Sequence, residues 1–150
     1  MMNSIFELKN EINVKTSNFV LLDVITMGIY SILYLYKYTS VIERVVKKNV
    51  FHSFFIVSIA ICYGVDVFCQ NLVLIDFWGE NHYSDLSIIL NFLIFILDRV
   101  WAFKIGIALK KYALNNYNLC FSMNKFYIFL FSNYYINYCI NDFCKNNVKA

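Results

Sequence analysis

The chain has 150 residues, of which 60% are apolar and 15% are charged, and its net charge is +3. Soluble domains are about 45–50% apolar and about 25% charged, so this composition excludes an ordinary soluble domain. It predicts an all-α membrane protein whose residues 1–150 form a single helical domain. The basic residues lie at the ends of apolar segments, which favours a role in membrane orientation and argues against nucleic-acid binding.

Four apolar stretches are expected to form helices, at residues 18–36, 51–76, 86–109 and 126–140. A helix needs about 20 apolar residues to cross the hydrocarbon core, and the second and third stretches supply them. We expect these two to form a central transmembrane hairpin, closed by an external loop at residues 77–85 that contains no Lys or Arg. The first and fourth stretches are shorter and more polar, so each is expected either to span or to be re-entrant or interfacial.

The basic residues predict the orientation of the chain. One group follows the first stretch and another separates the third from the fourth, so both connections should be cytoplasmic. If all four stretches span, both termini lie outside together with their own lysines. If the first and fourth stretches enter and leave on one face, or lie in the interface, both termini are cytoplasmic, and we favour this topology. The groups are Lys37, Arg44, Lys47 and Lys48, then Lys110, Lys111 and Lys125.

A distinctive motif lies in the first stretch and consists of Thr26, Gly28, Tyr30, Tyr34 and Lys37. Gly28 allows a close backbone approach or a break, and the Thr26 hydroxyl can bond to a helical carbonyl. Tyr30 and Tyr34 share one helical face at a spacing of four residues. The motif therefore predicts a tightly packed helix with aromatic residues near a membrane interface.

Residues 24–37, with the sequence VITMGIYSILYLYK, resemble the opening of a bacterial family of small membrane proteins classed only as a domain of unknown function. Residues 135–141, YINYCIN, are similar to that family's closing helix with Tyr and Asn. Members often have Trp at the position of Tyr34. The resemblance implies a multi-pass protein of the bacterial inner (cytoplasmic) membrane, and it implies no catalytic residue.

Polar residues inside the predicted hairpin are candidates for function, because charge at membrane depth is costly. Closing the hairpin at residues 77–85 places Asp66 near Ile96, and therefore within about one helical turn of Arg99. We expect these two to form an ion pair, with the amides nearby and Asp98 directed at another segment or protomer. The candidates are Asp66, Gln70, Asn71, Asn91, Asp98 and Arg99.

Two hypotheses describe the predicted pair. Asp66 and Arg99 either fix the register of the hairpin as a structural ion pair, which we favour, or belong to an ion or proton pathway.

Asn133, Asn137 and Asn141 recur every four residues in the fourth stretch. They form one helical stripe that can bond to a neighbouring helix.

The sequence predicts no cofactor, metal site or enzyme. Its five cysteines have no metal-binding spacing and its two histidines, His52 and His82, are far apart. We therefore expect a non-enzymatic membrane protein that acts through helix–helix contacts, as a subunit, scaffold or immunity-type partner. The alternative is a small oligomeric pore or an ion or proton transporter. The expected partners are the lipid bilayer and either a second copy or another membrane protein.

Overall fold

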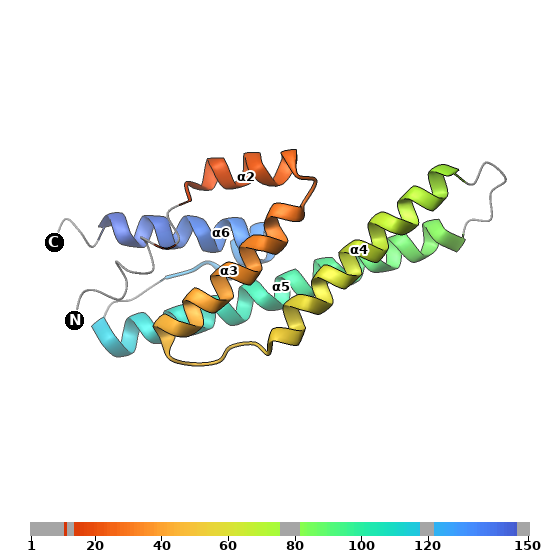
Figure 1. The fold of residues 1–150 in the computed structure, drawn as a ribbon. Helices are drawn as coiled ribbons and strands as arrows, with labels where there is room; N and C mark the ends of the chain where they lie inside the picture. The colour runs from red at the N-terminus through yellow and green to blue at the C-terminus, as the bar shows by residue number, and fades with distance from the viewer. Residues whose placement is uncertain (1–10, 12–13, 76–81, 118–121, 147–150) are drawn as a thin grey trace. The chain divides into compact units, whose positions relative to one another are not determined.

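The computed structural model of the chain describes residue 11 and residues 14–75, 82–117 and 122–146. These residues form the helices α2 (Thr16–Ile25), α3 (Ile29–Val46), α4 (Ser53–Ile75), α5 (His82–Tyr117) and α6 (Lys125–Asn146), without a strand among them. They divide into two compact units, His52–Asp98 and a second unit made of Met1–Phe51 with Arg99–Ala150 (Figure 1). We call the first the hairpin unit and the second the broken-helix unit.

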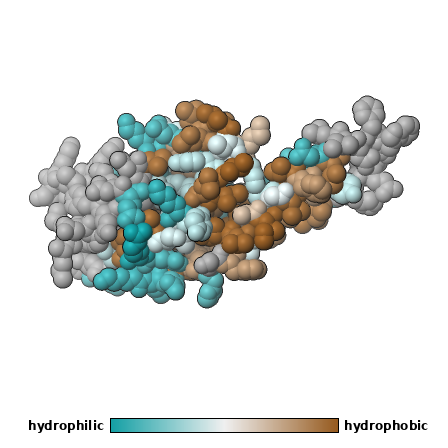
Figure 2. All heavy atoms as spheres, in the orientation of Figure 1, coloured by the Kyte–Doolittle hydropathy of each residue, from teal (hydrophilic) through white to brown (hydrophobic). Residues whose placement is uncertain are grey.

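The hairpin unit contains α4 and the first part of α5, which run side by side (Figure 1). Both helices are long and apolar enough to cross a membrane, over Phe54–Leu72 and Tyr83–Asn115. In the most apolar 18 residues of each helix, 22% and 11% of the residues are buried, whereas the core helix of a soluble protein is mostly buried. Hydrophobic side chains cover most of the visible hairpin surface (Figure 2). The predicted second and third helices are therefore confirmed as apolar helices of spanning length.

The first apolar stretch is not one helix, so the prediction for residues 18–36 is wrong in this respect. Helix α2 ends at Ile25, and Met27 and Gly28 then take positive φ angles of 51° and 92°. Glycine adopts this left-handed conformation without the steric cost of a Cβ. Helix α3 begins at Ile29 and continues to Val46, ten residues past the predicted end. The ten residues of α2 are about 15 Å long, half the thickness of a hydrocarbon core.

The fourth apolar stretch is also interrupted. Helix α6 extends over Lys125–Asn146, but Ser132 has φ 42° and ψ −117°, so one helix ends before it and another begins after it. Ser132 is 2% exposed. Neither of the two shorter stretches therefore forms a continuous helix of spanning length in the part of the chain that the structure describes.

Aromatic side chains form the core of the broken-helix unit. The ring of Phe19 stacks on Tyr34 at 4.1 Å between centroids, and Tyr34 stacks on Tyr38. Burial raises the pKa of Tyr38 above its usual range, so this ring stays uncharged. Next to Tyr38 in the sequence, Thr39 accepts a hydrogen bond of 2.7 Å from the buried Trp101 indole of α5. These contacts join α2, α3 and α5 within one unit.

Candidate functional site

The polar site in the hairpin unit is centred on the Asp66 carboxylate of α4. One carboxylate oxygen accepts hydrogen bonds from the Ser87 hydroxyl and from the Asn91 amide, the latter at 2.9 Å. The other accepts from the Gln70 amide at 2.9 Å. Gln70 lies one turn after Asp66 on α4, and Ser87 and Asn91 lie one turn apart on α5. Three uncharged donors from two helices therefore surround one carboxylate.

Burial is uneven across this site. Asp66 is 3% exposed and Ser87 is 8% exposed, but the side chains of Gln70 and Asn91 are exposed. Asp66 is therefore enclosed by the two helices, and its amide partners reach the surface of a mostly apolar hairpin.

The predicted register of the hairpin is wrong. The contacts of Asp66 with Ser87 and Asn91 lie about 1.4 to 2.5 helical turns nearer the loop than the predicted neighbour Ile96. The reason is the start of α5 at His82, because residues 82–85 are helical and were assigned to the loop. Residues 77–81 of that loop lie outside the described residues.

Ser87 was not among the predicted site residues. Its position one turn before Asn91, on the same face of α5, was the sequence signal that could have identified it.

The remaining predicted polar residues of the hairpin lie elsewhere. The exposed Asn71 amide donates to the Val67 carbonyl of its own helix at 2.8 Å and does not bond to Asp66. Asp98 is half-buried. Arg99 belongs to the broken-helix unit, where its guanidinium donates to the Leu130 carbonyl at 3.4 Å. Its pairing with Asp66 stays a prediction.

The motif around Gly28 forms the turn between α2 and α3. The Thr26 hydroxyl donates to the Leu22 carbonyl at 2.8 Å and accepts from the Tyr30 amide at 3.0 Å. It thus satisfies a carbonyl at the end of one helix and an amide at the start of the next. The Gly28 amide closes the turn by donating to the Asp23 carbonyl at 2.9 Å. Tyr30 and Tyr34 both contact the Phe19 ring, whereas Lys37 is exposed.

Asp23 is a site residue that the sequence did not single out. Its carboxylate is 8% exposed, accepts the Ser31 amide at 2.8 Å, and also accepts the Tyr134 hydroxyl of α6. One side chain thereby joins α2, α3 and α6. A carboxylate six residues before a helix start is not a recognised capping pattern, so the sequence offered no signal for this role.

Two amides of the predicted asparagine stripe bond to the segment that begins α2. Asn137 donates to the Val14 carbonyl at 3.2 Å and to the Thr16 hydroxyl at 3.1 Å, and Asn141 donates to Val14 at 3.1 Å. Asn133 is 4% exposed in the same helix. In this chain the stripe therefore contacts a neighbouring segment of the same unit.

The site offers carboxylate and amide groups, and no described cluster of three His, Cys, Asp or Glu side chains is arranged to hold a metal ion. Among the described cysteines, Cys69 and Cys139 are buried thiols and Cys62 is half-buried. The chain was compared with protein-family models, with curated proteins and with solved structures, and none of them matches it. The resemblance of residues 24–37 to a bacterial membrane family therefore stays a prediction.

Proposed function

We propose that this chain is a non-enzymatic integral membrane protein that acts through helix–helix contacts, as a subunit, scaffold or immunity-type partner. In this proposal α4 and α5 cross the bilayer as a hairpin, and the shorter broken helices are re-entrant or lie in the interface. The interruptions at Gly28 and Ser132 support that topology, because α2 is too short to span. The bacterial inner membrane is the location that the resemblance implies.

The observation that carries the proposal is a set of exposed amides on apolar helices. Gln70, Asn71 and Asn91 are exposed. The surface around them is apolar, because Phe68 and Ile89 on the same helices are 63% and 64% exposed. Asp66 lies about 9 Å from the Leu72 end of the apolar window of α4. Amides at membrane depth bond to neighbouring helices, with about 0.6–2 kcal/mol for each contact. A partner helix from a second copy or another membrane protein could make further hydrogen bonds to these amides, each of which has two N–H donors and a carbonyl acceptor.

Photo-crosslinking in intact membranes tests this proposal. A photoreactive residue at position 71 leaves the hydrogen bonds of Asp66 in place, because Asn71 bonds to Val67. We expect it to form a discrete protein adduct. The matched control is position 89, which lies about 160° around α5 from Asn91 and faces lipid in the proposal. Equal adduct formation at both positions would reject the amide contact. Release of the chain by alkaline carbonate would reject membrane insertion.

A second candidate function, an oligomeric pore or an ion or proton transporter, is favoured by one observation. A buried carboxylate is connected through hydrogen bonds to exposed amides, and such a chain of polar groups can begin a polar path. The test is the flux of a pH-sensitive dye in proteoliposomes that contain the wild-type chain or Asp66→Asn. Flux that the substitution abolishes would place this function first. Equal background leak for the two proteins would remove it.

A further inference from the structure

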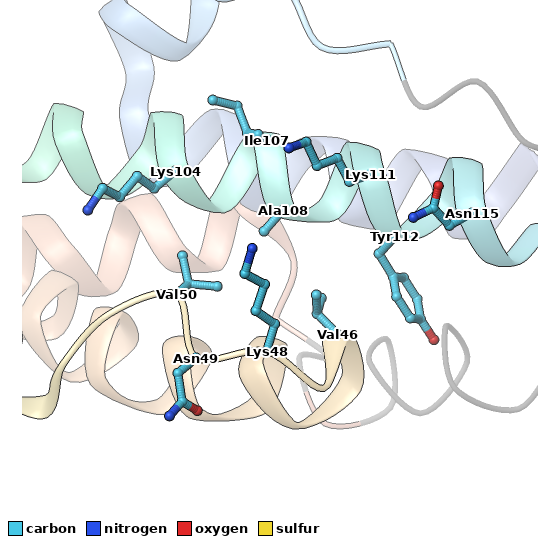
Figure 3. A pocket seen from close by; sticks show the side chains of 10 residues that line it. All are labelled: Val46, Lys48, Asn49, Val50, Lys104, Ile107, Ala108, Lys111, Tyr112 and Asn115. Carbon is cyan, nitrogen blue, oxygen red and sulfur yellow. The ribbon is translucent and has the colours of Figure 1, made fainter.

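A cavity of about 380 Å³ lies in the broken-helix unit, between the end of α3 with its following loop and the last turns of α5 (Figure 3). Its described lining contains three lysines and no acidic residue. Amide and phenol groups from Asn49, Asn115 and Tyr112 add hydrogen-bonding capacity, and the rest of the wall is aliphatic. The lysines are Lys48, Lys104 and Lys111. The cavity therefore combines positive charge with an apolar wall.

Contacts of the loop after α3 and of Lys104 fix parts of the cavity lining that carries the lysines. One Glu43 carboxylate oxygen accepts the amides of Val50 at 2.7 Å and Phe51 at 2.8 Å, which fixes the loop after α3. The ammonium of Lys104 lies 4.8 Å from the centre of the Phe51 ring, a cation–π contact. The Lys48 side chain extends from the loop toward α5, near Ala108 (Figure 3). The side chains of Lys104 and Lys48 are therefore both placed, one against the Phe51 ring and the other directed toward α5.

The position of the cavity along α5 matches a membrane surface. In the sequence, Lys104 follows Tyr83 by 21 residues, and a helix needs about 20 residues to cross a hydrocarbon core. If the crossing begins at Tyr83, Lys104 lies near its other end. Lys111 lies two turns beyond Lys104 on α5, about 10 Å farther along the helix, at the aqueous side of the headgroup layer. The aliphatic wall includes Ile107, which is 54% exposed between these lysines.

We propose that this cavity binds the phosphate group of an anionic membrane phospholipid in the cytoplasmic leaflet. Lysine ammonium groups bind phosphate as compact point charges, and basic pockets on the cytoplasmic side of membrane helices suit anionic headgroups. The apolar wall distinguishes a lipid from a free phosphate ion, because glycerol and upper acyl carbons can contact Ile107. The inference rests on the proposed insertion of the hairpin in a bilayer.

Native mass spectrometry of the full chain from vesicles tests the inference. The vesicles contain phosphatidylcholine alone or mixed with phosphatidylglycerol, and the measurement is the phosphatidylglycerol retained per protein. The test variant is K48Q/K104Q/K111Q. The matched control, K37Q/K110Q/K125Q, removes the same charge from exposed lysines that do not line the cavity. We expect the test variant to retain at least about tenfold less phosphatidylglycerol than the control, since each lysine contributes to headgroup binding.

A third variant, K48R/K104R/K111R, keeps the charge and should keep the lipid, which separates loss of binding from misfolding. Equal lipid retention by the test and control variants overturns the inference. Displacement of the lipid by an equal concentration of inorganic phosphate also overturns it, because that result identifies a site for a soluble anion. Failure of the wild-type chain to float with either vesicle rejects the proposed membrane insertion instead.

Discussion

Each unit buries an aspartate, Asp66 in the hairpin unit and Asp23 in the broken-helix unit, but the donors differ. Asp66 accepts from three side chains on the two helices of its hairpin. Asp23 accepts the backbone amide of Ser31 and the hydroxyl of Tyr134, which is 111 residues away in the sequence. The contrast arises because Asp66 lies within a continuous helix, whereas Asp23 lies just before a helix break.

Continuous helices satisfy their own backbone groups, so a carboxylate between α4 and α5 has side chains as its available donors. A helix break releases backbone amides that need acceptors, and the break at Gly28 has such acceptors in Asp23 and Thr26. The same residue type thus sets helix pairing in one unit and closes a turn in the other. Substitutions in the two units should therefore have different effects on stability.

The largest expected effect follows from Asp23→Ala. The change removes a helix cap, which costs about 1 kcal/mol, and leaves the Tyr134 hydroxyl without its acceptor, which costs about 1–3 kcal/mol. We expect a loss of about 3 kcal/mol in the free energy of unfolding, measured in mixed micelles. Tyr134→Phe alone should cost less, because the Ser31 cap remains. If the two substitutions add fully in the double variant, the Asp23–Tyr134 contact is not important to stability.

A smaller effect is expected for Asp66→Leu. Three membrane hydrogen bonds at about 0.6 kcal/mol each give a loss of about 2 kcal/mol. The predicted Arg99 ion pair gives a different expectation, because an uncompensated buried charge costs about 3–5 kcal/mol. Adding Arg99→Gln should then restore stability. Recovery in the double variant would establish the ion pair, whereas an unchanged loss of about 2 kcal/mol would leave the three hydrogen bonds as the contribution of Asp66 to stability.

The success of the sequence predictions differs between the units for a physical reason. The lengths of α4 and α5 follow from hydropathy, because a run of apolar residues needs no partner information to be recognised as a helix. Their register depends on where α5 begins, and polar residues such as Ser84 and Asp85 favour loops and helix starts alike. A shift of a few residues in that start was enough to misplace the partner of Asp66.

The broken helices could be predicted in part. Gly28 indicated a break or a close approach, and the structure contains a break there. Ser132 carries no comparable signal, since serine is tolerated within helices and this one lies inside an aromatic-rich run. The contacts of Asp23 with Tyr134, and of Asn137 with Val14, join segments more than 100 residues apart. Local patterns do not contain such pairings, so the core of this unit required the structure.

The smallest expected effect comes from two glycines, one in each unit. Gly28 has φ 92°, so Gly28→Ala forces a Cβ into a left-handed conformation and should cost about 1–2 kcal/mol. Gly64 lies within α4, where an added Cβ would meet no atom within 4 Å. Gly64→Ala should therefore stabilise the chain by about 0.5–1 kcal/mol through its higher helix propensity. The unfolding free energies of the two variants in one detergent provide the measurement.

The opposite signs make this pair a sharp test of where the helices are broken. If α2 and α3 formed one continuous helix, Gly28 would lie in a helix interior and its replacement by alanine would stabilise the chain as at position 64. A gain for both variants would therefore contradict the turn at Thr26–Gly28 and restore a single first helix. Stabilisation at Gly64 with destabilisation at Gly28 would place the break in one unit and the continuous helix in the other. Asparagine tolerates left-handed conformations better than alanine, so Gly28→Asn should lose less stability than Gly28→Ala.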